Sequence, residues 1–362
     1  MIQESSLSGL AGRMAFERPA PGWQRRTCNG VLEAVGGTPL VRLERYLDLY
    51  DVELFAKLEY LNPGGSAKDR PARKMIEDAL EAGEIRRGQT VVESTSGNMG
   101  IGLAQACAYH GLKLVCVVDP NAQLQNVAIM QALGATIEWV REPVNGDFLT
   151  ARLQRVREIQ ERDPNVYWTN QYENQRNPEA HFESTIQEID DVFGDSVDVL
   201  FVATSSTGTA SGCQNFLKER GRQTKVVAVD AEGSVLFGGE KGPRLIPGLG
   251  AGTVPGLAKG KHFDSLCRVS DVRCVVGCRR AAMREAMLVG GSAGGVLEAV
   301  RSLQTELVGK RCVAILHDSG VRYLDTVYSN NWVKEKLGVE VEELRSLIDA
   351  NCVECLERDT FR

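Results

Sequence analysis

The chain has 362 residues, of which 43% are hydrophobic and 25% charged, and its formal net charge is -6. This balance allows one large hydrophobic core or two smaller ones, and it argues against nucleic acid as a partner, because no Lys/Arg-rich run is present. No stretch approaches the roughly 20 consecutive apolar residues of a membrane span, and residues 1–26 lack the apolar centre of a signal peptide. We therefore expect a globular cytoplasmic protein.

Short β-branched runs alternate with longer amphipathic stretches along most of the chain. The first part predicts strands at 52–59, 90–95, 113–119 and 136–140, and helices at 69–81, 99–109 and 123–133. A helical, charged middle follows at 149–162 and 181–193, and further strands are predicted at 197–204, 225–230 and 311–318. This alternation indicates an α/β fold of two lobes, with mostly parallel sheets flanked by helices.

The segment NPGGSAKDRP at 62–71 follows a predicted strand and enters a predicted helix. Lys68 therefore lies near a helix N-terminus, where the helix dipole and partial burial both lower the pKa of an amine and make it a better nucleophile. The alternative is a solvated lysine paired with Asp69, which is the commoner situation for a lone lysine.

Two further strand ends carry hydroxyl-rich loops. In ESTSGNMG at 93–100, backbone amides with Thr95, Ser96 and Asn98 suit a carboxylate, although an ordinary capped helix explains the same pattern. TSSTGT at 204–209 offers hydroxyls and amides to a phosphate, without the lysine of a Walker A loop or a GxGxxG dinucleotide loop. A Ser/Thr turn without a ligand remains the alternative there. A fourth loop, GGSAGG at 290–295, is a weak signal alone.

Ten cysteines are scattered along the chain. Cys107, Cys116 and Cys312 lie in apolar segments, as buried reduced thiols do. Cys352 and Cys355 form a CxxC pair without a partner His or a second pair. We interpret this spacing as accidental and expect no metal site.

In this order, the four loops resemble the cysteine synthase and cystathionine β-synthase family of fold-type II pyridoxal-phosphate enzymes, which are tryptophan synthase β-like. The resemblance covers roughly residues 30–333. It implies that pyridoxal 5'-phosphate forms a Schiff base with Lys68, which then serves as the catalytic base. It also implies that Asn98 lies beside the cofactor's phenolic oxygen and that the Ser292 hydroxyl meets its pyridine nitrogen. The cofactor phosphate would lie on Thr204, Ser205, Ser206, Thr207, Gly208 and Thr209.

The resemblance further implies an amino-acid substrate, whose carboxylate would bind Thr95, Ser96, Asn98 and Gln171. A neutral hydroxyl at the pyridine nitrogen favours prompt loss of a β-substituent over a long-lived carbanion, so we expect β-elimination and replacement. Homodimerisation is implied by the family alone.

Two positions depart from cysteine synthases. The phosphate loop of those enzymes is typically GTGGT, where this chain has SSTGT, and Met99 replaces a usual Thr. Both departures resemble a siderophore-pathway branch of the family. That resemblance implies O-phospho-L-serine as donor and the amino group of L-glutamate as nucleophile, with Arg152, Tyr172, Ser205 and Met99 at substrate-handling positions. In that branch an NAD-dependent dehydrogenase converts the product to 2,3-diaminopropionate.

Three alternatives stay open. The first is a cysteine or cystathionine synthase that uses sulfide or a thiol acceptor. The second is a catalytically silent binding module, and the third, a nicotinamide-dependent oxidoreductase, lacks its glycine fingerprint.

The expected domain organisation has four parts. Residues 1–29 form an N-terminal extension, 30–65 with 175–340 form a large cofactor-binding lobe, 66–174 form a small mobile lobe that closes over the substrate, and 341–362 form a helical tail.

Overall fold

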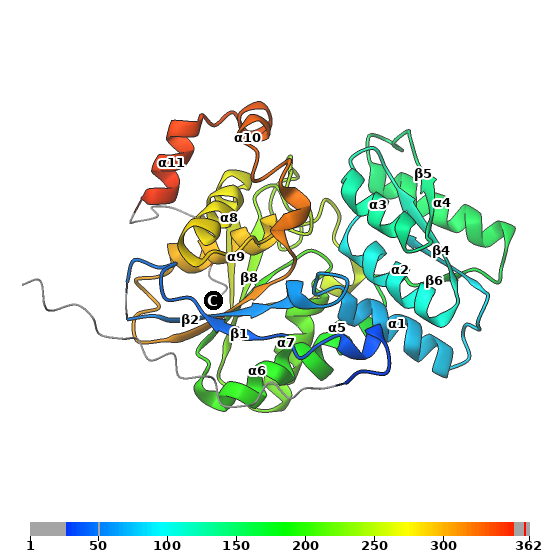
Figure 1. The fold of residues 1–362 in the computed structure, drawn as a ribbon, viewed down its shortest axis with the longest axis horizontal. Helices are drawn as coiled ribbons and strands as arrows, with labels where there is room; N and C mark the ends of the chain where they lie inside the picture. Colours follow the sequence, from blue (N-terminus) through cyan, green and yellow to red (C-terminus); the bar gives the residue numbers. More distant parts are fainter. Residues whose placement is uncertain (1–26, 50, 351–357, 360–362) are drawn as a thin grey trace, which may run out of the picture.

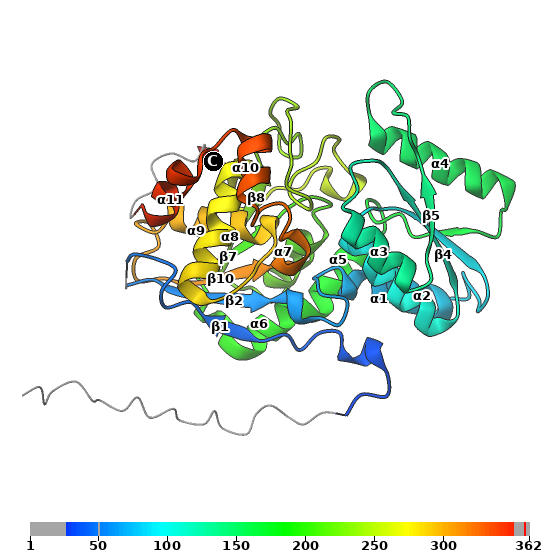
Figure 2. The ribbon, with the colours of Figure 1, turned by 45° about the horizontal axis from the view of Figure 1, so that its top comes forward.

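The computed structural model describes residues 27–49, 51–350 and 358–359. Its helices and strands form two bodies that lie side by side, each built on its own sheet (Figure 1). Figure 2 shows the same two bodies after a rotation. Helices α8 to α11 lie on the body with the seven-stranded sheet, and α3 and α4 lie on the body with the four-stranded sheet.

The larger sheet has seven strands, of which the five central ones are parallel and the two edge strands antiparallel. In spatial order they are β1 (Leu40–Arg42), β2 (Glu53–Leu58), β10 (Arg311–Leu316), β7 (Val199–Ala203), β8 (Lys225–Ala231), β9 (Ser265–Val269) and β11 (Arg358–Asp359). Alternate residues of a strand point to opposite faces, so this sheet supports a core on each side. Leu200 and Val202 enter one core, and Phe201 and Ala203 the other.

Helices cover both faces of the larger sheet. One face carries α5 (Arg176–Ala180), a π-helical turn (His181–Thr185), α6 (Ile186–Phe193) and α7 (Gly208–Glu219). The other carries α8 (Asp271–Glu285) and α9 (Gly291–Ser302), with α10 (Asn330–Leu337) and α11 (Val341–Asp349) outside them (Figure 1). Short 3-10 turns are η1 (Val31–Ala34), η2 (Glu59–Leu61), η4 (Gly194–Ser196), η5 (Gly256–Ala258) and η6 (Gly320–Tyr323).

The smaller sheet has four parallel strands in the order β5 (Thr136–Trp139), β4 (Lys113–Val118), β3 (Thr90–Ser94) and β6 (Tyr167–Trp168). One face packs against α1 (Asp69–Glu81), α2 (Asn98–His110) and α3 (Leu124–Ala132), and the other against α4 (Phe148–Arg162).

The predicted α/β fold with mostly parallel sheets is confirmed, and each predicted strand is present with ends within two residues. The predicted C-terminal helix ends at Asp349, and Arg358–Asp359 pair with β9 as a strand instead of continuing it. Cys352 and Cys355 lie outside the described residues, and the cysteines at 107, 116 and 312 are buried free thiols. No helix in the described part of the chain has the length and apolarity to cross a bilayer.

Candidate active site

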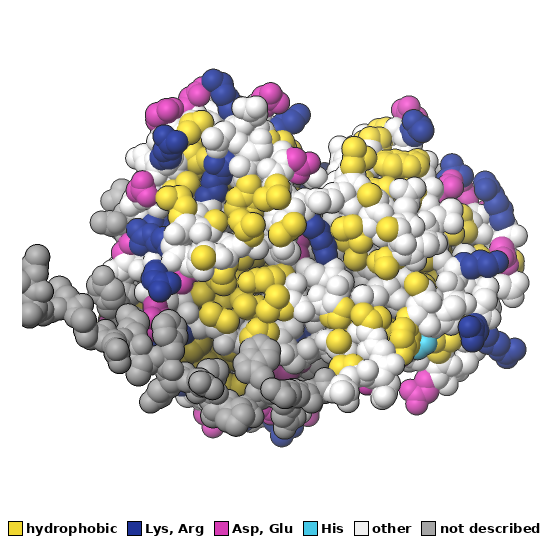
Figure 3. Space-filling model, in the orientation of Figure 1, with side chains coloured by type: hydrophobic (Ala, Val, Ile, Leu, Met, Phe, Trp, Pro, Cys, Tyr) yellow, Lys and Arg dark blue, Asp and Glu magenta, His cyan; other side chains and the backbone are white. Residues whose placement is uncertain are grey.

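A cavity lies where the carboxyl ends of the parallel strands β7 and β10 meet the first turns of α1, α2, α7 and α9. Ligands of open α/β sheets bind at such junctions. The notch between the two bodies at the upper edge of the space-filling view marks where they come together (Figure 3). The lining residues are Ala67, Lys68, Asn98, Ala203, Ser205, Ser206, Thr207, Gly208, Thr209, Gly248, Ser292 and His317.

The loop that carries Lys68 is fastened to the end of β10. The backbone N–H of Ala67 donates to the carbonyl of His317 at 2.8 Å, and Lys68 immediately precedes α1. Removal of water from the amine lowers the pKa of Lys68 to about 8. An amine with this pKa is partly unprotonated near neutral pH, which makes it available as a nucleophile and as a base.

The hydroxyl loop between β7 and α7 has a constrained backbone. Thr207 adopts a φ of 65°, a left-handed conformation that a β-branched residue rarely takes. A Cβ on Gly208 would lie 2.1 Å from Oδ1 of Asn177, so only glycine fits there. The hydroxyl of Thr207 is buried and has no hydrogen-bond partner among the described residues. The loop therefore faces the cavity with an unused hydroxyl, as a site for an acceptor-rich group requires.

The side-chain amide of Asn98 is held at both ends. Its nitrogen donates to Oδ2 of Asp318 at 2.8 Å, and Arg322 donates to its oxygen. Asp318 also accepts from the hydroxyl of Tyr323 at 2.6 Å. The sequence reasoning missed all three partners, and the only local signal was that Asp318 ends a predicted strand.

The loop that carries Ser292 meets the same aspartate. The backbone N–H of Gly290 donates to the carbonyl of Asp318 at 2.9 Å, and a Cβ on Gly290 would lie 2.0 Å from Oδ1 of Asp318. Ser292 follows in the first turn of α9 and lines the cavity. Asp318 thus connects the loops of Ser292 and Asn98.

Residues 31–318 match the family model described as "Pyridoxal-phosphate dependent enzyme". The chain belongs to this family. Its cofactor is pyridoxal 5'-phosphate, and the predicted resemblance to cysteine and cystathionine synthases is confirmed by the relatives.

Three relatives are informative. The chain is 43% identical over 305 residues to the N-(2-amino-2-carboxyethyl)-L-glutamate synthase of Ralstonia nicotianae, covering 84% of this chain and 90% of that protein. An O-acetylserine dependent cystathionine β-synthase from Helicobacter pylori superposes with a TM-score of 0.77 at 31% identity, covering 84% of this chain and 100% of that one. A hydrogen sulfide-producing enzyme from Fusobacterium nucleatum gives a TM-score of 0.76 at 32% identity, covering 82% and 98%. The chain is therefore a pyridoxal-phosphate-dependent β-replacement enzyme.

The cavity fits this cofactor. The hydroxyl of Thr207 is buried without a hydrogen-bond partner among the described residues, so this polar atom can bind a ligand in the cavity. Burial lowers the pKa of His317 to about 3, which keeps the imidazole neutral and leaves Lys68 as the cationic group of the cavity wall. Pyridoxal phosphate supplies an electron sink for charge that develops at the α-carbon of an amino acid.

The structure brings Lys68, Asn98, Ser292 and the loop 205–209 to one cavity, but it places Thr204 differently. The hydroxyl of Thr204 donates to the carbonyl of Val229 at 2.9 Å and so holds the loop to β8. Met99 is 2% exposed within the core that α2 shares with the smaller sheet. Packing therefore accounts for the apolar residue at this position.

The residues that line the cavity do not include five predicted substrate residues, namely Thr95, Ser96, Gln171, Arg152 and Tyr172. The hydroxyl of Thr95 accepts from the N–H of Gly100 at 3.2 Å, as a helix cap does, and the amide of Gln171 donates to the carbonyl of Ser94 at 3.3 Å. The Thr95 contact holds the start of α2, and the Gln171 contact holds the end of β3.

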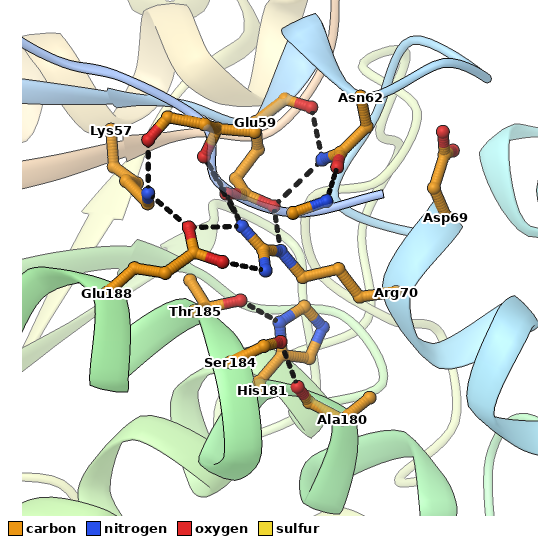
Figure 4. A network of polar contacts seen from close by, with 12 residues as sticks. Lys57, Glu59, Asn62, Asp69, Arg70, Ala180, His181, Ser184, Thr185 and Glu188 are labelled. Atoms are coloured by element: carbon orange, nitrogen blue, oxygen red, sulfur yellow. Dashed lines mark hydrogen bonds and ion pairs between the residues drawn. The ribbon is translucent and has the colours of Figure 1, made fainter. Parts of the chain in front are cut away.

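A buried ionic cluster joins α1 to the larger body (Figure 4). The guanidinium of Arg70, two residues after Lys68, forms paired hydrogen bonds of 2.6 to 2.8 Å with both Glu59 and Glu188. Burial alone would raise the pKa of Glu59, but the charge and hydrogen bonds of Arg70 lower it to about 2. Lys57 completes the cluster by donating to Glu188 at 2.5 Å. The cluster therefore fixes α1, the helix that follows Lys68, to the larger body.

Proposed function

We propose that this enzyme joins O-phospho-L-serine to L-glutamate and forms N-(2-amino-2-carboxyethyl)-L-glutamate and phosphate. The bond between Cβ and the phosphate oxygen breaks, a bond from the glutamate nitrogen to Cβ forms, and that nitrogen loses a proton. The observation that carries this proposal is the 43% identity, over 84% of the chain, to a protein named for that product.

We propose a role in handling the donor amino acid for each of three side chains of the cavity. We propose that Lys68 holds the cofactor and, once displaced by the substrate, takes the proton from its α-carbon, for which a pKa of about 8 is suited. Asn98 lies at the start of α2, where the backbone amides and the helix dipole attract the donor carboxylate. Ser292 offers a neutral donor to the pyridine nitrogen, which favours release of the β-substituent.

The acceptor site is proposed around Arg152, Tyr172 and Ser205. Nε of Arg152 lies 3.0 Å from Oδ2 of Asp119, yet its N–H makes no hydrogen bond within the described residues. Burial raises the pKa of the Tyr172 phenol, and the nearby charge of Arg152 opposes this rise. A guanidinium beside a phenol suits the side-chain carboxylate of glutamate. Ser205, at the cavity wall, adds a hydroxyl donor.

The rival function is a synthase with sulfide or a thiol as acceptor. The observation that favours it is the structural likeness to an O-acetylserine dependent cystathionine β-synthase and to a hydrogen sulfide-producing enzyme. Their identities of 31% and 32% are lower than the 43% of the glutamate relative, which is why we place it second.

Product analysis tests the two functions. Purified holoenzyme is incubated with O-phosphoserine or O-acetylserine, each combined with glutamate, sulfide or homocysteine, and the products are identified by mass. We expect the glutamate adduct and an equal amount of released phosphate, with no product from a Lys68→Ala variant. Cysteine or cystathionine as the sole product contradicts the proposal.

Four further properties belong to the proposed function. We propose a homodimer in the cytoplasm, a product consumed by an NAD-dependent dehydrogenase in siderophore synthesis through 2,3-diaminopropionate, and a smaller lobe (66–174) that closes over the substrate. Closure would exclude water from the reacting centre. Sedimentation tests the dimer, and scattering with and without substrate tests the closure.

A further inference from the structure

A histidine outside the cavity contacts the end of the phosphate loop. Nε2 of His181 lies 3.1 Å from the hydroxyl oxygen of Thr209, and Nδ1 lies 2.8 Å from that of Thr185 (Figure 4 shows the contact with Thr185). Thr209 lines the cavity, whereas His181 and Thr185 are fully buried behind it. The three side chains thus form one hydrogen-bonded row that ends at the cavity wall.

The backbone is built to bring this row together. His181 begins the π-helical turn His181–Thr185, a rare geometry that is frequent at functional sites and here aligns a ring with a hydroxyl four residues later. α7 approaches this turn closely, because a Cβ on Gly212 would lie 2.9 Å from Cβ of His181 and 2.9 Å from the backbone nitrogen of Phe182. The position of the imidazole against Thr209 is therefore set by two elements.

A neutral imidazole has one N–H and one nitrogen lone pair, so the hydrogen bonds along this row can run in either of two directions. Burial, reinforced by the nearby charge of Lys68, holds the pKa of His181 well below its ordinary value, so the ring is neutral. In one direction Nδ1–H donates to Thr185, and Thr209 donates its only hydroxyl proton to Nε2. In the other, Thr185 donates to Nδ1, and Nε2–H donates to Thr209, whose own proton remains available to the cavity.

We propose that His181 is a positioning residue for the cofactor phosphate, and that it adopts the Nε2–H form so that the hydroxyl of Thr209 donates into the cavity. The inference rests on the proposed placement of the phosphate on loop 205–209. A phosphate monoester dianion offers only acceptors at neutral pH, so Thr209 must donate to it. The same direction also gives the hydroxyl proton of Thr185 its acceptor, and no other partner for that hydroxyl occurs in the described part of the chain.

Nitrogen-15 NMR of the histidine rings tests the direction without relying on activity. The chain has four histidines, and a His181→Asn variant assigns the signal. In protein loaded with pyridoxal phosphate we expect Nε2 of His181 to carry the proton and Nδ1 to be unprotonated. Protonation at Nδ1, or at both nitrogens, overturns the proposal.

A matched pair of variants tests the consequence. His181→Gln places an amide N–H near the position of Nε2, whereas His181→Asn places one near Nδ1. For each apoprotein, the affinity for pyridoxal phosphate is compared with that for pyridoxal, which lacks the phosphate. We expect the asparagine variant to lose about tenfold in this ratio and the glutamine variant to recover much of it. Equal ratios in both variants and the unmodified protein overturn the proposal.

Thr209→Val and Thr209→Ser separate this proposal from its premise. If the valine variant binds pyridoxal phosphate as tightly as the serine variant, Thr209 does not hold the phosphate and the placement fails. If the valine variant alone is weakened but His181 carries its proton on Nδ1, the placement stands and the role of His181 fails. Neither result depends on which acceptor amino acid the enzyme uses.

Discussion

The side-chain nitrogen of Asn98 donates a hydrogen bond to Asp318 at 2.8 Å, although 220 residues separate them in the chain. Asn98 begins α2 beside the smaller sheet, whereas Asp318 follows β10 of the larger one. An amide nitrogen has two hydrogens, so one remains for the cavity once Asp318 has taken the other. This contact joins the two bodies at the cavity, where the side-chain amide of Asn98 is positioned by both of them.

Arg322 fixes the orientation of that amide by donating to its oxygen, and it also donates to the carbonyl of Gly64. We predict that Arg322→Met lowers kcat/KM at least about tenfold, because only the hydrogen bond to Asp318 then holds the amide. The visible absorbance of the bound cofactor should change as well, and Arg322→Lys should lose less. Unchanged absorbance in the methionine variant would contradict this assignment.

The amine of Lys68 should react with pyridoxal phosphate according to its lowered pKa of about 8. Only the unprotonated amine attacks an aldehyde, so the attachment rate to apoprotein should rise with pH and level off above about 8. Stopped-flow absorbance measures this rate. After borohydride reduction, peptide mass analysis should find the cofactor on Lys68, and a label elsewhere would refute the proposed mechanism.

Glu59 should give the protein a distinct sensitivity to acid. Its folded pKa of about 2 lies below the ordinary 4.5, so its stabilising contribution is complete above about pH 4.5 and disappears as the pH falls toward 2. We expect this contribution to be about 3 kcal/mol. Glu59→Gln should make unfolding less dependent on pH in this range and should destabilise the protein by about 3 kcal/mol at neutral pH.

Denaturant unfolding of the apoprotein at several pH values measures both effects. Glu44→Gln is the matched control, because Glu44 is exposed and lies 3.9 Å from Arg42, a spacing that contributes less than about 1 kcal/mol. If the two variants unfold alike, the cluster around Arg70 does not stabilise the fold.

Gly208→Ala should weaken cofactor binding at least about tenfold, because the added methyl group would collide with Asn177 and displace the loop. Gly97→Ala is the comparison, since a Cβ there meets nothing within 4 Å and its φ is not positive. It should keep its affinity for pyridoxal phosphate. Equilibrium titration of each apoprotein with the cofactor decides between these outcomes.

Most of the strands and site loops that could be predicted were recognised from patterns of residues close together in the sequence. The β-branched runs marked β2, β3, β4, β7 and β10, and glycine-rich junctions after strands marked the loops of Lys68 and 204–209. β9 (Ser265–Val269) escaped prediction because Cys267 and Arg268 interrupt its pattern. His181, Asp318 and Arg322 were missed for a different reason. Their contacts join segments far apart in the chain, and such pairing arises from tertiary packing, which local periodicity does not encode.

The place of β10 between β2 and β7 has a consequence for synthesis on the ribosome. Until residue 316 has been made, β2 and β7 lack the strand that separates them, and the loop of Lys68 has no His317 carbonyl to hold it. In a nascent chain, Lys68 is therefore synthesised long before its loop can be held in place. During that time β2 and β7 each expose an unpaired apolar edge. Pyridoxal phosphate therefore binds late, after almost the whole polypeptide has emerged.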